Sequence, residues 1–163
     1  MTNLKNKVAL VTGSARGIGK AIAVRYGSLG ASLVVNYATD EKRSQETVAE
    51  IERTGAVAIA VQADISKVAG IDRLFAAALE KFGRLDIVVA NAGVELVGQS
   101  VLDFTEADFD RLFGINTKGA FFTLQGAAKH VADNDRIIIS SQAIQFSLAG
   151  PCSALERRTM WPT

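Results

Sequence analysis

The stretch Thr12–Gly19 reads TGSARGIG, and it stands between a short apolar run and a segment of helical period. Glycine tolerates a positive φ and leaves space beside the backbone, so Gly13 suits a tight turn and Gly17 the close approach of a ligand. Gly19 suits close packing of the helix on the strand. The first N–H groups of that helix and its dipole would face the turn. The stretch therefore predicts a phosphate-binding turn, with a packing turn that binds no ligand as the alternative.

Outward from this turn, apolar runs alternate with segments of helical period. Strands are expected at residues 7–11, 32–36, 57–61, 86–90 and 137–139, and helices at 17–29, 40–54, 68–82 and 105–130. The runs are continuously apolar, so both faces of each strand should be covered, as in parallel sheets. The expected fold is an α/β, Rossmann-type doubly wound parallel sheet of about five strands with helices on both faces.

Composition narrows the class of protein. The chain has 163 residues, 48% of them hydrophobic, which is enough for one domain with its own core. Its 18 basic and 17 acidic residues give no basic excess, so no nucleic acid partner is expected. Cys152 is the single cysteine, and neither an internal disulfide nor a metal site is expected. No apolar segment is long enough for a membrane, and a cytoplasmic location is expected.

The tip of the second expected strand bears on the choice of cofactor. Dinucleotide-binding folds usually carry an acidic residue about 20 residues beyond the glycines, where it binds the ribose 2′-hydroxyl. Here the strand ends in Asn36-Tyr37-Ala38-Thr39, without a carboxylate that would repel a 2′-phosphate. Arg16 could supply a cation, and Asn36, Thr39 and Lys42 further donors, so NADP(H) is favoured over NAD(H). The alternative is that these charges are simply solvated.

Five motifs carry a resemblance to a known family. They are the glycine turn, Ala63-Asp64-Ile65, Asn91-Ala92-Gly93, Asn116 and Ser140-Ser141, in this order. Over residues 5–150 the chain resembles the short-chain dehydrogenases/reductases, and residues 83–93 are similar to that family's fourth strand and the turn after it. Residues 36–38 are also similar to NADPH-using fungal naphthol and ketone reductases of the family.

The resemblance implies a cofactor site on the glycine turn and the strand ends. Its expected residues are Gly13, Ser14, Arg16, Gly17, Ile18, Gly19, Asn36, Tyr37, Ala38, Asp64, Ile65, Asn91, Ala92 and Gly93. Asp64 would bind the adenine amino group while Ile65 packs beside the ring. A cap on the next helix is the other role open to Asp64. Residues 91–93 would line the nicotinamide ribose side of the cleft.

The resemblance also implies two catalytic residues, Asn116 and Ser141. Asn116 would hold a water in a proton relay, and an asparagine inside a helix can also bend it. A solvent-facing asparagine is the alternative. Ser141 would orient the carbonyl of a small-molecule ketone or alcohol, with Ser140 as the other candidate.

The family's catalytic Tyr and Lys are absent from the expected place. They would lie four residues apart near Ala154–Glu156, whereas the chain has no tyrosine beyond Tyr37 and no lysine beyond Lys129. The prediction is therefore an NADP(H)-binding oxidoreductase by family, transferring hydride between NADPH and a ketone or alcohol, but inactive or severely impaired in this form. A non-catalytic nucleotide-binding or regulatory module that pairs with a full-length relative is the alternative.

The expected organisation is a dinucleotide-binding domain over 1–150 and an irregular, divergent tail over 151–163. The resemblance implies that the C-terminal part of the family fold is missing, whether by truncation, splicing or frameshift. The strand at 137–139 would then be an exposed apolar sheet edge. The helix around 105–130 is the expected surface for homo- or hetero-oligomers.

Overall fold

The computed structural model of the chain describes residues 3–96, 100–131 and 135–140. The strands are β1 (Val8–Val11), β2 (Ser32–Tyr37), β3 (Ala58–Gln62), β4 (Ile87–Ala90) and β5 (Arg136–Ile139). The helices are α1 (Gly17–Ser28), α2 (Glu41–Glu52), α3 (Val68–Phe82), α4 (Glu106–Phe113) and α5 (Ala120–His130), with a 3-10 turn η1 (Val101–Asp103) and a π-helical turn η2 (Gly114–Gly119). The bounds differ from the expected ones by at most two residues.

All five strands are parallel and follow the order β3-β2-β1-β4-β5. The chain winds from β1 outward to β3 and then returns past β1 to β4, so the order reverses between β1 and β4. Ligands of doubly wound folds bind at such a reversal, beyond the carboxyl ends of the strands. The predicted α/β, Rossmann-type sheet is confirmed.

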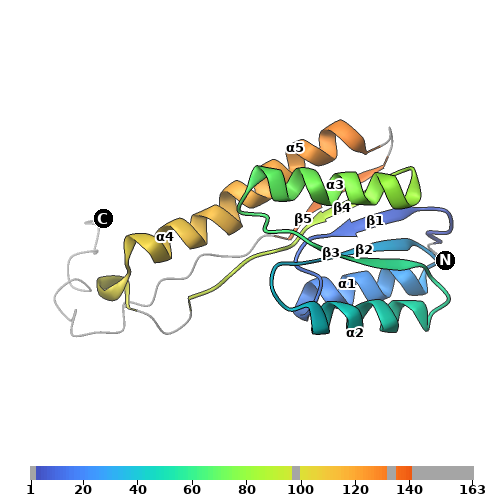
Figure 1. Ribbon diagram of the computed structural model, residues 1–163, viewed down its shortest axis with the longest axis horizontal. Helices are drawn as coiled ribbons and strands as arrows, with labels where there is room; N and C mark the ends of the chain where they lie inside the picture. Colours follow the sequence, from blue (N-terminus) through green and yellow to red (C-terminus); the bar gives the residue numbers. More distant parts are fainter. Residues whose placement is uncertain (1–2, 97–99, 132–134, 141–163) are drawn as a thin grey trace, which may run out of the picture.

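Helices cover both faces of the sheet because successive side chains of each strand point to opposite faces. Val8 and Leu10 of β1 pack in one apolar cluster with residues of α3 and α5. Ala9 and Val11, between them in the chain, pack in the other cluster with residues of α1 and α2. Figure 1 shows the result, a sheet between the α1–α2 layer and the α3–α5 layer, with α4 extending beyond the sheet.

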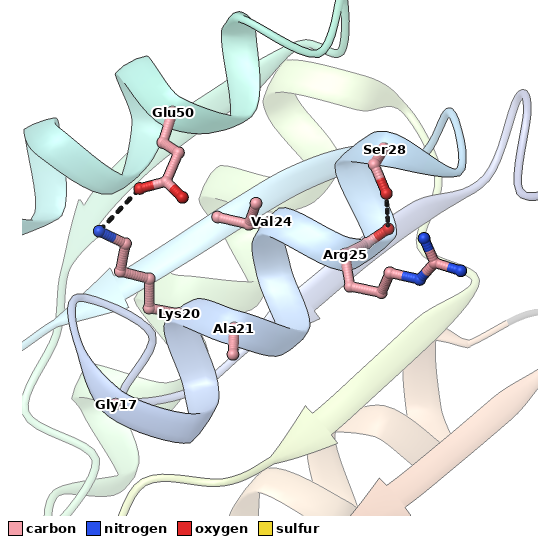
Figure 2. Close-up of a pocket in the computed structure, with 7 residues that line it drawn as sticks. All are labelled: Gly17, Lys20, Ala21, Val24, Arg25, Ser28 and Glu50. Atoms are coloured by element: carbon pink, nitrogen blue, oxygen red, sulfur yellow. Dashed lines mark hydrogen bonds and ion pairs between the residues drawn. The ribbon is translucent and has the colours of Figure 1, made fainter.

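The predicted start and end signals of the helices hold. The Asp40 carboxylate accepts a hydrogen bond from the Arg43 N–H at 3.0 Å and caps α2. Gly83, with φ +70°, ends α3 in the left-handed conformation that glycine favours. On the outer surface, Lys20 of α1 and Glu50 of α2 form an ion pair at 2.8 Å (Figure 2).

The long helix over 106–130 differs from the expected one in its middle. Thr105 and Asp108 form a reciprocal capping box at its start. The predicted uninterrupted α-helix is corrected at η2, where a π-helical turn joins α4 to α5. Asn116 lies in this turn, and its side chain bonds to another segment, as described below. The turn therefore stands where the sequence placed a residue that disfavours regular α-helix.

A charged cluster ties the amino ends of three strands together. The Asp86 side chain is fully buried and accepts hydrogen bonds from the Lys7 ammonium (3.0 Å), the Val8 N–H (2.9 Å) and both Arg84 donors, of which Nε lies at 2.9 Å. Lys7 also pairs with Asp135 at 2.7 Å, ahead of β5. Burial alone raises the pKa of Asp86, but the hydrogen bonds from Arg84, Val8 and Lys7 outweigh it and hold that pKa well below its usual range.

Strand β5 is the edge of the sheet as described. Ile137, Ile138 and Ile139 are 42%, 39% and 54% exposed, unlike the residues of β1 and β4, which are buried throughout. The predicted exposed apolar edge is thus confirmed for residues 3–96, 100–131 and 135–140. Within these same residues, none of the helices has the length and apolar character that a membrane span requires.

Candidate functional site

A cleft of about 440 Å³ lies at the carboxyl ends of β1 to β4. Residues from the glycine turn, from the ends of β2, β3 and β4 and from the α4–η2 segment share its wall. They are Gly13, Ala15, Arg16, Asn36, Tyr37, Ala38, Thr39, Asp40, Arg43, Ala63, Asp64, Ile65, Ala92, Gly93, Val94, Arg111 and Ile115. Nine of the predicted cofactor-binding residues are among them, brought together from four separate segments.

The glycine turn leaves open space at its front. Gly13 and Gly17 have φ of +63° and +59°, in the left-handed region that favours glycine. A Cβ built on Gly17 would meet no atom within 4 Å. Arg16, in extended backbone, precedes α1 without a side-chain cap, and the first turn of α1 holds no acidic residue. An anion can therefore approach the positive end of α1 without a competing carboxylate.

Two other glycines of the turn are needed for packing. A Cβ on Gly13 would lie 2.8 Å from Cα of Ala92, so the turn touches the backbone beyond β4. A Cβ on Gly19, which is buried, would lie 2.5 Å from Nδ2 of Asn91 and 2.6 Å from the carbonyl oxygen of Gly13. These contacts fix the turn against the ends of β1 and β4, as the sequence predicted for Gly19.

Asn36 and Ser14 hold the turn from below. Asn36 is 2% exposed, its Oδ1 accepts from the Gly13 N–H at 3.0 Å, and its Nδ2 donates to the Ala63 carbonyl at 3.0 Å. The Ser14 hydroxyl donates to the Val11 carbonyl at 2.7 Å and accepts from the Asn36 N–H at 3.1 Å. Both side chains thus connect β1, β2 and β3 at their carboxyl ends. Contacts of these two residues with a ligand stay a prediction.

Thr12 is a site-building residue that the sequence analysis did not single out. Its buried hydroxyl accepts hydrogen bonds from the N–H groups of Asn91 (2.9 Å) and Ala92 (3.0 Å). Asn91 is 5% exposed, and its Nδ2 donates to the Thr12 carbonyl at 3.0 Å. Asn91 therefore lies beneath the cleft wall, while Ala92 and Gly93 form part of it. A hydroxyl directly after a buried strand was the available signal.

Asp64 and Ile65 lie at the end of β3, where the sequence placed an adenine site. One Asp64 oxygen accepts from the Ser66 hydroxyl at 2.7 Å and the Ser66 N–H at 3.0 Å, and these hydrogen bonds lower its pKa. The alternative role as helix cap is wrong, because the residue that caps α3 is Lys67. Ile65 is 6% exposed and packs on the core while it lines the cleft.

Three arginines line the cleft, of which only Arg16 was predicted there. Arg43 pairs with Asp40, Nε to Oδ2, at 3.2 Å, so the carboxylate that follows the tip of β2 is neutralised locally. The sequence analysis did not place this carboxylate in the cleft. Lys42, proposed as an extra donor, is not among the lining residues. Ile18, the second residue of α1, is 65% exposed.

The two predicted catalytic positions fare differently. The Asn116 side chain accepts from the Val94 N–H and donates to the Val94 carbonyl, both at 2.9 Å, so the alternative of a solvent-facing side chain is wrong. This pair of bonds ties η2 to the segment after β4. Ser140 follows β5, and its N–H donates to the Ala90 carbonyl at 3.0 Å. Ser141 lies outside the described residues.

The sequence profile described as short chain dehydrogenase matches residues 7–152. The chain belongs to the short chain dehydrogenase family. Hydroxynaphthalene reductase-like protein Arp2 of Metarhizium brunneum is 52% identical over 139 residues, which are 85% of this chain and 52% of that protein. The chain thus spans about half the length of the curated relatives it matches.

Solved structures of short chain dehydrogenases show the same fold. One from Burkholderia cenocepacia, in complex with NADP, is 39% identical with a TM-score of 0.80 over 84% of this chain and 56% of that one. The landomycin C-6 ketoreductase LanV, with bound NADP and rabelomycin, is 40% identical with a TM-score of 0.78 over 84% and 58%. In the part of this short chain dehydrogenase that the structure describes, no three His, Cys, Asp or Glu side chains gather as a metal site would require.

Proposed function

We propose that this chain is an NADP(H)-binding member of its family. The observation that carries the proposal is the open front of the glycine turn, where Gly17 has no neighbour within 4 Å of its Cβ position and the uncapped amino end of α1 faces the cleft. Backbone N–H groups and a helix dipole in this arrangement bind a pyrophosphate. The NADP complexes of the related structures support this assignment.

The remaining cleft residues fit the rest of the cofactor. Asp64 and Ile65 offer a carboxylate and an apolar side chain to the adenine base. Arg16 lines the cleft without an ion pair among the described residues, and is the cation for a 2′-phosphate. The nearby Asp40 carboxylate is compensated by Arg43, so it does not repel that phosphate. Ala92 and Gly93 would flank the nicotinamide ribose.

We expect the purified chain to bind NADPH more tightly than NADH, as measured by cofactor fluorescence and calorimetry. Arg16→Ala should weaken NADPH binding roughly tenfold, because a charge-assisted bond to phosphate is lost, and leave NADH binding nearly unchanged. Lys42→Ala, which removes a cation outside the cleft wall, is the matched control. Equal affinity of the unmodified chain for both cofactors would contradict the NADP(H) assignment, and absence of binding would overturn the function.

The proposed chemistry is the reduction of a small aromatic ketone or the reverse oxidation. The bound cofactor supplies the hydride, and the names of the relatives suggest substrates of the hydroxynaphthalene and polycyclic ketone kind. Asn116, fixed by its two bonds to Val94, would hold a water near the proton path, and Ser141 would orient the carbonyl. The chain itself offers no tyrosine beyond Tyr37 and no lysine beyond Lys129 to protonate the product oxygen.

For the 163-residue chain we therefore expect NADPH binding with little or no turnover. A positioned general acid contributes roughly 10²- to 10⁴-fold to rate, and the arginines at positions 157 and 158 do not release a proton near neutral pH. NADPH consumption with an aromatic ketone, followed at 340 nm on protein of verified mass, checks this. Turnover typical of the family, on the order of 10 s⁻¹, would show that another group donates the proton.

A second candidate function is a non-catalytic module that pairs with a full-length relative. It is favoured by the exposure of Phe109 (49%) and Phe121 (59%) on the helix over 106–130. Large apolar side chains exposed on one helix are typical of protein–protein contacts. Mass measurement in solution, with and without a full-length relative, separates a paired chain from a free one.

A further inference from the structure

The wall of the cleft includes Arg111 and Ile115, which none of the sequence motifs singled out. Arg111 belongs to α4, and Ile115 follows four residues later in η2. Side chains four residues apart lie near each other on a helix surface. The long helix therefore contributes a second pair of residues to the cleft besides its Asn116 bonds to Val94.

The packing of this helix places Arg111 at the adenine end of the proposed site. A Cβ on Gly114 would lie 3.7 Å from Cβ of Ser66, and one on Gly119 would lie 2.8 Å from Cδ1 of Ile65. The α4–η2 segment is thus packed on the residues that directly follow Asp64. Arg111, one turn before Gly114, borders the same part of the cleft.

The charge of Arg111 has no structural use in the described part of the chain. No acidic side chain there lies within ion-pair distance of it, and the nearby Asp64 carboxylate is bonded by Ser66. A cation at a free helix C-terminus stabilises the helix dipole. That explanation does not apply here, because α4 continues through η2 into α5.

We propose that Arg111 is a further cofactor-binding residue, whose planar guanidinium stacks on the outer face of the adenine base. Guanidinium groups are weakly hydrated and stack on aromatic rings, and a base presents such a face. The apolar side chains of Ile65 and Ile115 complete a pocket that is apolar at its base and cationic at its rim. The inference rests on the proposed cofactor function and names a residue for its adenine half.

The test measures binding of NADPH, 2′,5′-ADP, AMP and reduced nicotinamide mononucleotide to the full chain. Arg111→Ala should weaken the three adenine-containing ligands by roughly five- to tenfold, all by a similar factor, and leave the mononucleotide unchanged. Arg111→Lys should show most of the same loss, because it keeps the charge but not the plane. Arg25→Ala is the control: Arg25 is an exposed arginine of α1 on the far groove of Figure 2, and its loss changes net charge equally.

Each result decides the matter. A loss confined to 2′,5′-ADP and NADPH would assign Arg111 to the 2′-phosphate and overturn the adenine role, as would full affinity in Arg111→Lys. Unchanged binding in Arg111→Ala, or an equal loss in Arg25→Ala, overturns the inference but leaves the cofactor function standing. Failure of the unmodified chain to bind NADPH overturns both. Should Arg111→Ala not fold, Arg111→Lys and Arg111→Met carry the comparison.

Discussion

Asp86→Asn is expected to lower the free energy of unfolding by about 3 kcal/mol at pH 7. Both Asp86 oxygens are buried and accept hydrogen bonds from Lys7, Val8 and Arg84. An amide in this place turns one acceptor into a donor that faces other donors, and it removes the charge that both cations need. Because the cluster joins the starts of β1, β4 and β5, its loss weakens the whole sheet. Urea unfolding at pH 7 measures the change.

The pH dependence gives this prediction its sign check. The pKa of Asp86 is lower in the folded chain than in the unfolded chain, so its stabilisation is complete above the unfolded value of about 4. That stabilisation is lost as the pH falls from there toward the folded value. The unmodified chain should therefore lose stability below about pH 4 more steeply than Asp86→Asn.

Glu50→Gln is the matched control for Asp86→Asn. Glu50 also pairs with a lysine, Lys20 at 2.8 Å, but both side chains are partly exposed on the helix surface (Figure 2). An ion pair of this kind contributes less than about 1 kcal/mol. Similar destabilisation by the two variants would mean that the buried cluster has no special weight.

Gly17→Ala is expected to weaken NADPH binding by roughly thirtyfold or more while the chain stays folded. A Cβ at this position meets no protein atom within 4 Å, but it occupies the space through which a pyrophosphate would approach the N–H groups of α1. Loss of one charge-assisted hydrogen bond, about 2 kcal/mol, corresponds to that factor. Calorimetric titration with NADPH measures it, alongside thermal unfolding of the ligand-free protein.

Gly55→Ala separates the ligand effect from the backbone effect. Gly55, between α2 and β3, also has a positive φ (+85°) and no neighbour within 4 Å of its Cβ position, but it lies away from the cleft. Both variants should lose about 1 kcal/mol of stability, the cost of an alanine in the left-handed region. Only Gly17→Ala should lose affinity, and NADPH binding at the original strength in Gly17→Ala would refute the assigned phosphate site.

The sequence predicted well whatever local chemistry determines. The apolar runs of β1 and β4 are buried on both faces, and Asp40 and Gly83 begin and end helices where their side-chain chemistry or backbone freedom suggests. The glycine turn falls between strand and helix for the same reason. Each of these features depends on a few neighbouring residues, so each can be recognised without knowing the fold.

The parts of the site that were missed depend on contacts between distant segments. Thr12 meets Asn91 and Ala92, about 80 positions away in the chain, and Arg111 reaches the cleft only because α4–η2 packs on the β3–α3 loop. Likewise, no local rule says that the amide of Asn36 will bond to Gly13 and Ala63. Register between strands and helix packing decide these contacts, and a single sequence does not display them. The 1–150 boundary, Ser141 and the tail lie outside the described residues and stay predictions.

The π-helical turn η2 shifts the phase of the long helix. An α-helix advances by about 100° per residue, and a π turn accommodates roughly one extra residue, so everything after it is rotated by about that angle relative to a regular helix. A helical wheel drawn through 106–130 without this shift would therefore place the residues of α5 on the wrong side. Deleting a single residue within Gly114–Gly119 could restore a regular helix, but it would turn either Leu112 or Ala127 out of its buried position. The extra residue is thus a built-in offset that lets one helix pack on the sheet at one end and present Asn116 to Val94 at the other.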